Sequence, residues 1–514
     1  MHPFHHAQTH PDKAAVIFAS GTRISYAELD AHSNQVAHLL RKHGIVEGDA
    51  VAIFLENEPS YFEIMWGCQR TGTYSVPISS RLLADELAYI VGDCGAKLLF
   101  ASPGLEAIAR DALSQLGDVT LILTGESYKA ARDAEPTTPV ADEAGGIEMV
   151  YSSGTTGKPK GIRPALPLGP IDAPTRMGAV AQGRYGMADD TVYLSPAPLY
   201  HAAPLRWAMT VHRLGGTAVV MEKFDAETVL RLIQAHGVTH AQFVPTHFSR
   251  LLALPEEVRA SYDTSSLRVA VHAAAPCPRE VKEAMMGWWG PILYEYYAGS
   301  EGNGVTVASP EDWLSHPGTV GRGVGCEVKI CGEDGEPLAD PEAEGVVYFA
   351  GGLPFEYHND PEKTAASRNS HGWSTLGDVG RLDKDGFLFL TDRKNFMIIS
   401  GGVNIYPQEI ENAIISHPLV FDAAVVAAPH PDLGEQVTAV VQPLHWNDAG
   451  AKLAADLRAY LRERISHVKV PRSIDFMEEL PRLPTGKLMK RHLRDAYFGA
   501  NDEVAALIVK GDRP

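Results

Sequence analysis

Cysteine is scarce in this chain and widely spaced. The five cysteines among 514 residues are Cys68, Cys94, Cys277, Cys326 and Cys331, and no two of them form a CxxC pair. A zinc knuckle needs closely paired thiolates, and a disulfide framework needs many cysteines in a short chain. The sequence therefore indicates neither, and we expect a protein of the cytoplasm.

Long apolar runs are also missing. No stretch approaches the ~20 apolar residues that a membrane-spanning helix requires, so we expect no integral membrane segment. The opening residues, MHPFHHAQTHPDK, contain no apolar signal-peptide core. His2, His5, His6 and His10 in this opening are potential metal ligands, but a frayed chain end is the favoured interpretation.

Positive charge is in deficit as well. The 45 lysines and arginines face 64 aspartates and glutamates, which gives a net charge of −19 at pH 7. Most of such a surface repels phosphate groups, which argues against nucleic acid and anionic membranes as partners. An anionic small molecule must therefore find a local basic pocket.

What the chain does contain is alternating helix and strand signals. Its length exceeds what one core usually holds, so we expect at least two domains. Ser25 and Glu28 form a capping box before an amphipathic helix that Gly44 can end. Strand-like and helical stretches then alternate to about residue 101 and again from 217 to 245, which favours a parallel α/β sheet.

The sequence pattern changes twice further along the chain. From about residue 320, short alternating strands with Gly/Asp turns predict a β-rich subdomain. Beyond TDRKN (391–395), two helices and a strand predict a small α+β C-terminal domain. Leu453, Leu457, Leu461 and Ile465 form one apolar stripe there, and packing on the domain's own sheet is favoured over a partner.

The stretch YSSGTTGKPKG, Tyr151 to Gly161, is rich in glycines and hydroxyl groups and carries two lysines. Glycines let backbone N–H groups approach oxyanions, so a phosphate-binding loop is indicated. It is not a Walker A loop, because Ser152 stands where that motif needs glycine, and Pro159 follows Lys158. We expect a flexible flap that no helix follows, with a solvated turn as the alternative.

Six downstream motifs accompany this loop: PLYH (198–201), AAAPCP (273–278), YYAGSEG (296–302), GWSTLGD (372–378), TDRKNFMIISGGVNIYPQEIE (391–411) and LPRLPTGKLMKR (480–491). Together and in this order they resemble the adenylate-forming superfamily, which includes acyl-CoA and aryl-CoA ligases. The resemblance implies an α/β fold with a large N-terminal domain of mixed sheets and flanking helices. It places that domain at residues 1–391 and a mobile C-terminal lid at 392–514, with the hinge near 392–396.

The resemblance implies an ATP site around the opening loop. Hydroxyl groups would donate to phosphate oxygens, glycines would allow close approach, and a lysine would supply positive charge. The matching residues are Ser152, Ser153, Gly154, Thr155, Thr156, Gly157 and Lys160. The loop would close over the phosphates and open to release pyrophosphate.

Other motifs match the rest of the ATP site. Glu301 matches a glutamate that binds magnesium (Mg²⁺), and Ser300 replaces the usual threonine before it. Residues matched to adenine and ribose are Ala275, Pro276, Tyr297, Asp378 and Arg393, whereas Leu376 departs from a common threonine. Without the resemblance, Tyr297 reads as a core aromatic and Asp378 as a turn former.

The lid and the acyl side are matched too. Lys487 matches the lysine that bridges the substrate carboxylate and the α-phosphate; without the resemblance it is a surface charge. His201 matches a gate beside the carboxylate, and Gly401 and Gly402 match the loop that borders the coenzyme A tunnel. Asn395, followed by Phe396, stands at the expected hinge where relatives carry charged residues, which predicts unequal half-reactions.

The acyl pocket is matched by apolar or small residues: Tyr200, Trp207, Phe243, Pro245, Thr246, Ala273 and Ala274. A buried ammonium would need a carboxylate partner, so an amino-acid substrate is disfavoured. We therefore expect a fatty, aryl or polycyclic carboxylic acid as the small-molecule substrate, with ATP, Mg²⁺ and coenzyme A. A free-standing carrier protein as acceptor, a single half-reaction, luciferase-like oxygenation, a catalytically silent homologue and a homodimer stay open.

Overall fold

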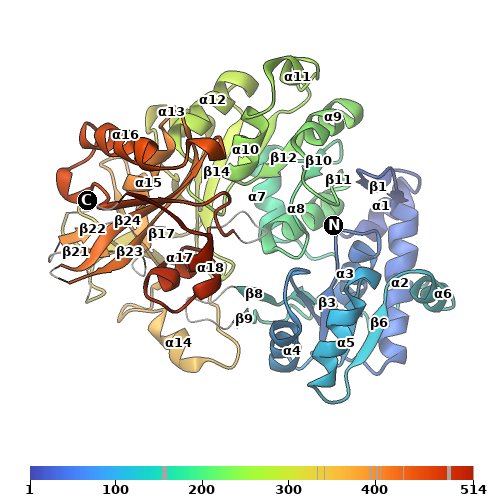
Figure 1. Cartoon of the computed structure of the whole chain (residues 1–514). Coiled ribbons are helices and arrows are strands. Elements are labelled where there is room, and N and C mark those ends of the chain that lie inside the picture. Colours follow the sequence, from blue (N-terminus) through green and yellow to red (C-terminus); the bar gives the residue numbers. More distant parts are fainter. Residues whose placement is uncertain are drawn as a thin grey trace.

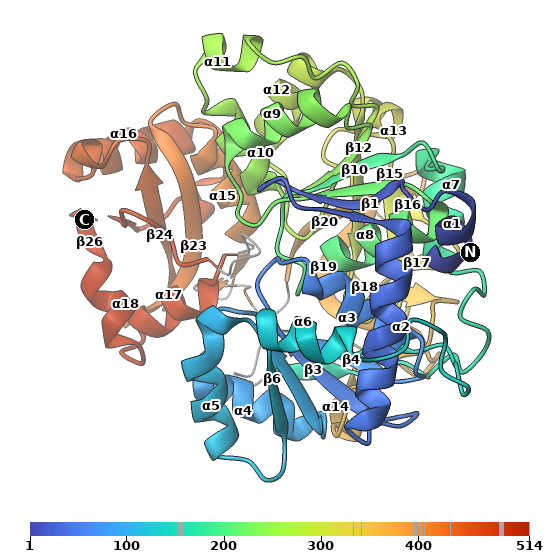
Figure 2. The same cartoon turned by 90° about the vertical axis from the view of Figure 1, so that its right-hand side faces the viewer.

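The computed structural model describes residues 1–152, 159–332, 334–340, 342–393, 396, 398–400, 403–405, 407–431, 433–482 and 488–512. Three sheets, a short hairpin and their helices form a large N-terminal part, and one more sheet with its helices forms the C-terminal domain, drawn in orange and red (Figures 1 and 2). The predicted α/β fold class is confirmed.

The first sheet has five parallel strands in the order β6-β5-β3-β4-β7. Its strands are β3 (Ala50–Phe54), β4 (Tyr74–Pro77), β5 (Leu98–Ala101), β6 (Thr120–Leu123) and β7 (Ile147–Glu148), and its helices are α2 (Tyr26–Lys42), α3 (Ser60–Gln69), α4 (Ala84–Asp93), α5 (Glu106–Ser114) and α6 (Glu126–Asp133). The predicted capping box of Ser25 and Glu28 begins α2. Residues of β3 alternate between two core clusters, so both faces of this sheet are covered.

The second sheet has nine strands in the order β16-β15-β14-β13-β12-β10-β11-β1-β2, parallel in the centre and antiparallel at its edges. The strands are β1 (Ala14–Phe18), β2 (Arg23–Ser25), β10 (Val192–Ser195), β11 (Thr217–Val220), β12 (His240–Phe243), β13 (Val269–His272), β14 (Leu293–Ala298), β15 (Val305–Ala308) and β16 (Arg322–Gly323). Its helices are α7 (Arg176–Tyr185), α8 (Ala202–Leu214), α9 (Ala226–His236), α10 (Pro245–Leu252), α11 (Glu256–Ala260) and α12 (Arg279–Trp289). Residues of α7 and α8 pack with one face, and residues of α9, α10 and α12 pack with the other.

The predicted β-rich subdomain is a four-stranded antiparallel sheet of β17 (Glu327–Cys331), β18 (Gly345–Ala350), β19 (Ser374–Leu382) and β20 (Leu388–Arg393). Two short helices lie in the neighbouring connections, α13 (Pro310–Ser315) and α14 (Pro361–Ala366). A separate hairpin, β8 (Val150–Ser152) and β9 (Lys160–Ile162), flanks the predicted phosphate loop.

The C-terminal domain is built on a six-stranded sheet of β21 (Ile398–Ser400), β22 (Val403–Ile405), β23 (Val420–His430), β24 (Gly434–Pro443), β25 (Ser473–Phe476) and β26 (Val509–Asp512). Its helices are α15 (Pro407–Ile415), α16 (Ala451–Arg462), α17 (Lys490–Tyr497) and α18 (Asp502–Leu507). Leu453, Leu457 and Leu461 are buried against this sheet, with Ile465 partly buried beside them. The prediction that the stripe packs on its own domain is confirmed.

The chain start differs from the expected frayed end. Residues Pro3–Thr9 form the helix α1, and His2 caps it with its ring fully buried, 4.8 Å from the ring of Trp66. His6 Nε2 lies 3.0 Å from the carbonyl oxygen of Arg213. The frayed-end interpretation is wrong because these rings pack into the N-terminal core. Among the described residues, no helix combines the length and apolar composition that a bilayer span requires.

Candidate active site

The predicted phosphate loop joins β8 to β9. Tyr151 and Gly161 are paired across this antiparallel hairpin. Ser152 ends β8 and Lys160 begins β9, so the prediction that no helix follows the loop is confirmed. The matched residues between them, Ser153, Gly154, Thr155, Thr156 and Gly157, lie outside the described residues.

The hairpin brings Lys160 close to Glu301. Ile162 forms a bridge with Tyr357, and Gly161 accepts a backbone hydrogen bond from His358 at 2.8 Å. Lys160 Nζ therefore lies 5.3 Å from the centre of the Tyr357 ring, and Tyr357 Oη donates to Glu301 Oε1 at 2.8 Å. The lysine predicted to bind ATP phosphates and the glutamate predicted to bind Mg²⁺ thus flank one tyrosine.

A second lysine, Lys363, acts on the charge of Lys160. Lys363 lies in α14, where its backbone N–H donates to the capping residue Asp360 at 2.9 Å. Burial and the nearby Lys363 lower the pKa of Lys160 to about 8, with Glu301 and Asp360 opposing the shift. Crowding of two amines lowers the affinity of one of them for its proton, and an anion between them would relieve the repulsion.

The sequence motifs did not indicate that Tyr357 and Lys363 belong to the candidate site. The stretch DPEKT (360–364) predicts a capped helix start, because Asp360 caps and Pro361 occupies the first turn. Nothing in that pattern indicates that the segment before α14 lies against β9, which the bridge from Ile162 to Tyr357 establishes.

Tyr297 and Asp378 meet between two sheets. Tyr297 Oη at the end of β14 donates to Oδ2 of the buried Asp378 on β19 at 2.6 Å. The ring of Tyr297 stacks on Phe349 with centroids 5.8 Å apart. Asp378 is also the register partner of Arg393 across β19 and β20. The structure thus brings together three positions that the sequence matched to adenine and ribose.

Gly299 lies where the motif YYAGSEG (296–302) comes close to Leu376 of β19. A Cβ added there would come within 2.4 Å of Leu376 Cδ1 and 2.6 Å of Glu301 Oε2. A side chain at position 299 would therefore displace the ends of the Leu376 and Glu301 side chains, including the carboxylate of Glu301. Leu376, the departure from the usual threonine, therefore packs beside the motif.

The turn after β13 contains a strained residue. Ala274 has φ of 76°, in the left-handed region that disfavours side chains. Ala274 and Pro276 are exposed, Ala275 is half-buried and Ala273 is buried. Residues held in this conformation cluster at functional sites, where the surroundings determine the backbone.

His201 begins α8 beside Tyr200, with ring centroids 4.3 Å apart. Burial lowers its pKa to about 3, so the imidazole is neutral near pH 7. Within the described part of the chain, no group hydrogen-bonds its buried Nε2. A nitrogen without a partner suits contact with a ligand.

The residues matched to the acyl pocket do not all share one face. Trp207 packs against Tyr185 at 5.2 Å, whereas Phe243 packs against Phe248 at 5.3 Å and Trp289 at 5.5 Å. These two core clusters lie on opposite faces of the nine-stranded sheet, because successive strand residues belong to alternate clusters. Pro245 and Thr246 begin α10, on the side of Phe243.

Most of the residues matched to the lid lie outside the residues that the structure describes. Lys487, Gly401, Gly402 and Asn395 lie outside the described residues, as does the side chain of Arg393. Basic neighbours of Lys487 are engaged within the C-terminal domain: Arg482 with Asp422, Lys490 with Glu411 at 2.8 Å, and Arg494 with Glu435 at 3.7 Å. The half-buried Phe396 lies under Lys490, whose Nζ is 5.5 Å from the ring centre.

Comparison with known proteins places this site in a family. The model of the AMP-binding enzyme family matches residues 3–356, and that of the AMP-binding enzyme C-terminal domain matches residues 409–487. The chain is 33% identical over 506 residues to a feruloyl-CoA synthase of Amycolatopsis sp, covering 96% of this chain and 98% of the relative. It is 31% identical over 522 residues to the fatty acid–[acyl-carrier-protein] ligase ScoC of Streptomyces coeruleorubidus, covering 96% and 95%.

Among solved structures, o-succinylbenzoate CoA synthetase (MenE) from Bacillus subtilis in complex with its acyl-adenylate intermediate superposes with a TM-score of 0.80. It is 26% identical and covers 96% of this chain and 97% of that structure. The chain belongs to the AMP-binding enzyme family, as the sequence predicted. The predicted enzyme class, AMP-forming acid–thiol ligases, is confirmed.

Proposed function

We propose that this enzyme joins a hydrophobic carboxylic acid to coenzyme A in two steps. An oxygen of the carboxylate attacks the α-phosphorus of ATP, and pyrophosphate leaves with the electrons of the α–β phosphoanhydride bond. The thiolate of coenzyme A then attacks the acyl carbonyl of the acyl-AMP, and AMP leaves. The proximity of Lys160, Tyr357 and Glu301 is the observation that carries the proposal, because it gathers charge of both signs where phosphates and Mg²⁺ would meet.

Each part of ATP has a proposed contact. Lys160 binds the terminal phosphates, with Ser152 and Ser300 near them, and Asp378 accepts the ribose hydroxyls beside Tyr297. Glu301 Oε1 accepts the hydrogen bond from Tyr357, and we propose that Oε2, a hard oxygen ligand of the kind that Mg²⁺ prefers, binds the metal. Bound Mg²⁺ would neutralise charge that develops on the leaving pyrophosphate. Gly401 and Gly402 would border the coenzyme A tunnel.

Carrier protein is the second candidate acceptor, which the similarity to ScoC favours. The test is a panel of fatty, aryl and polycyclic carboxylic acids offered with ATP and Mg²⁺, with either coenzyme A or a phosphopantetheinylated carrier protein. Intact-mass detection scores the thioesters. We expect acyl-CoA; carrier-bound product alone would contradict coenzyme A as the acceptor, and no thioester from any acid would contradict the proposed reaction.

The domain boundary at residue 392 is likewise a proposal. It is supported by the change of sheet, since β20 ends at Arg393 in the four-stranded sheet and β21 begins at Ile398 in the six-stranded one. Adenylation would need Lys487 in the site and thioester formation would need Gly402 there. Phe396 contacts Lys490 within the C-terminal domain, so the proposed bias towards one arrangement rests on the sequence of the hinge.

Enlarging Ala274 to tryptophan is expected to narrow the set of accepted acids. The exposed alanine already occupies the left-handed region, so the change adds bulk at the turn that we propose borders the acyl group. Phe243→Leu is the comparison variant, because Phe243 is also matched to the acyl pocket but is buried against Phe248 and Trp289; it should lower thermal stability, and a change in selectivity would support its place in the pocket. The acid panel measures the selectivity of both variants, and thermal unfolding measures their stability. An unchanged profile of accepted acids in Ala274→Trp would place the pocket elsewhere.

The lowered pKa of Lys160 predicts a pH dependence. Below pH 8 the free enzyme carries the ammonium that attracts ATP; above pH 8 that charge is lost, so kcat/KM for ATP should fall, approaching about tenfold per pH unit. Lys160→Arg keeps its charge and should abolish this fall. Lys363→Gln removes a neighbouring positive charge and should move the break to higher pH. An alkaline limb that is the same in the parent and in Lys160→Arg would assign it to another group.

A further inference from the structure

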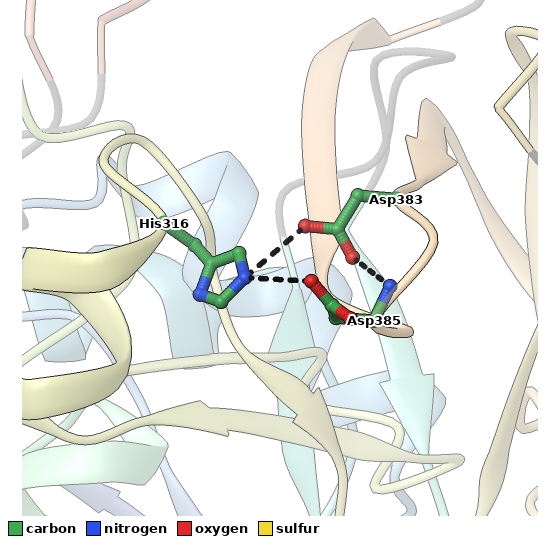
Figure 3. Close-up of side chains that lie close together, drawn as sticks. All are labelled: His316, Asp383 and Asp385. Carbon is green, nitrogen blue, oxygen red and sulfur yellow. Dashed lines mark hydrogen bonds and ion pairs between the residues drawn. The ribbon is translucent and has the colours of Figure 1, made fainter.

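Three side chains with metal-ligating atoms converge away from the proposed ATP site. His316 follows α13, and Asp383 and Asp385 lie in the turn between β19 and β20. His316 Nε2 is 3.3 Å from Asp385 Oδ2 and 3.8 Å from Asp383 Oδ2. Figure 3 shows both carboxylates facing the same ring nitrogen. The three ligand atoms all lie within 4.8 Å of one another.

Ser315 contacts the ring nitrogen of His316 that faces away from the two carboxylates. Its Oγ lies 2.9 Å from the carbonyl oxygen of Glu311 and 3.0 Å from that of Asp312, so the hydroxyl hydrogen is directed at the backbone. The contact of 3.0 Å between Ser315 Oγ and His316 Nδ1 then has Nδ1–H as the donor. Nε2 of His316 lies within hydrogen-bond distance of Asp385 Oδ2, at 3.3 Å, and a metal ion bound between the ring and the two carboxylates would take the place of a proton on this nitrogen.

Two of the three groups, His316 and Asp383, are held in place by contacts outside the cluster. The ring of His316 stacks on that of Phe387, with centroids 3.9 Å apart. The guanidinium carbon of Arg322 lies 4.1 Å from the centre of the Phe387 ring. Asp383 Oδ1 accepts the backbone N–H of Phe387 at 2.9 Å, which leaves Oδ2 directed at His316. A second ring nitrogen that donates to a fixed acceptor is the usual support of a metal-binding histidine.

We propose that His316, Asp383 and Asp385 bind a divalent transition-metal ion, with Zn²⁺ as the reference ion. Ligands roughly 2.0–2.2 Å from one zinc ion stand at separations close to those seen here. The imidazole distinguishes this site from one for Ca²⁺ or Mg²⁺, which prefer oxygen ligands throughout. Three protein ligands leave a coordination position for water.

Such an ion would tie two segments that the chain keeps far apart. The segment after α13 already pairs with the start of β20, since Val320 N–H donates to the carbonyl oxygen of Leu388 at 2.9 Å. The ion would add a second link at the turn itself. Because metal that binds only the folded state stabilises it by mass action, bound Zn²⁺ should raise the unfolding temperature.

The experiment compares full-length variants that have been freed of metal with a chelator. His316→Gln removes the imidazole, and His371→Gln is the matched control because His371 Nε2 faces a single carboxylate among the described residues, that of Glu336, at 2.8 Å. Zn²⁺ is titrated calorimetrically near neutral pH, and thermal unfolding is followed with and without it. The parent and His371→Gln should bind one Zn²⁺ more than His316→Gln, or bind it at least about tenfold more tightly.

Asp385→Asn is the second variant, because its exposed side chain can be neutralised without loss of the turn. It should lose both the Zn²⁺ affinity and the thermal shift. Zinc bound by the N-terminal histidines or by cysteines contributes equally to all variants and cancels in the difference. Equal binding by the parent, His316→Gln and Asp385→Asn, or equal competition by Mg²⁺, would overturn the proposal.

Discussion

Replacing Lys487 by alanine is expected to lower acyl-AMP formation by a factor on the order of 10²–10³, the usual effect of losing one preorganised charge contact in a transition state. The motif PTGKLMKR supports this role, and the structure adds that Arg482, Lys490 and Arg494 are engaged with carboxylates of the C-terminal domain. Thioester formation from supplied acyl-AMP should stay near the parent rate, because that step does not require charge at the α-phosphate.

The two half-reactions are measured separately, by pyrophosphate release with the acid and ATP, and by coenzyme A capture of synthetic acyl-AMP. Arg494→Ala is the control, since it removes a neighbouring basic group whose guanidinium faces Glu435. It should leave both rates within a few-fold of the parent. Near-normal adenylation by Lys487→Ala would refute the assignment, and an equal loss in both steps would indicate a structural role.

Glu301→Gln is expected to reduce adenylation by at least about tenfold at limiting Mg²⁺ and to raise the Mg²⁺ concentration needed for half-maximal rate. The amide oxygen can still accept the hydrogen bond from Tyr357 Oη, which puts the NH2 group in the place of Oε2, so the change removes both the negative charge and the oxygen that faces the proposed metal. Initial rates across a Mg²⁺ series at fixed ATP provide the measurement.

Tyr357→Phe separates positioning from ligation. It removes the hydroxyl that donates to Glu301 at 2.8 Å and leaves the carboxylate in place. We expect a smaller loss of rate than in Glu301→Gln and a modest change in Mg²⁺ dependence. If Glu301→Gln retained the parent's rate and Mg²⁺ dependence, Glu301 would serve the fold and not the metal.

Much of the fold could be predicted because its signals are local. The capping box of Ser25 and Glu28 lies within one helical turn, and the stripe of Leu453, Leu457 and Leu461 repeats at helical spacing. Such patterns depend on few neighbouring residues and on the period of the helix. Strand and helix alternation likewise predicted the parallel sheets, since parallel strands need a crossover between them.

The candidate site likewise has features that local motifs predict and features that depend on tertiary contacts. The family could be recognised from the sequence, and Glu301, Tyr297 and Asp378 could be named as candidates, because ordered motifs can be matched without knowledge of contacts. The influence of Lys363 on Lys160 and the burial of His2 became visible in the folded structure. That structure also separated Trp207 from Phe243 across the sheet and set His316 against Asp385. These relations join segments far apart in the chain, and packing between sheets, which no local pattern encodes, determines them.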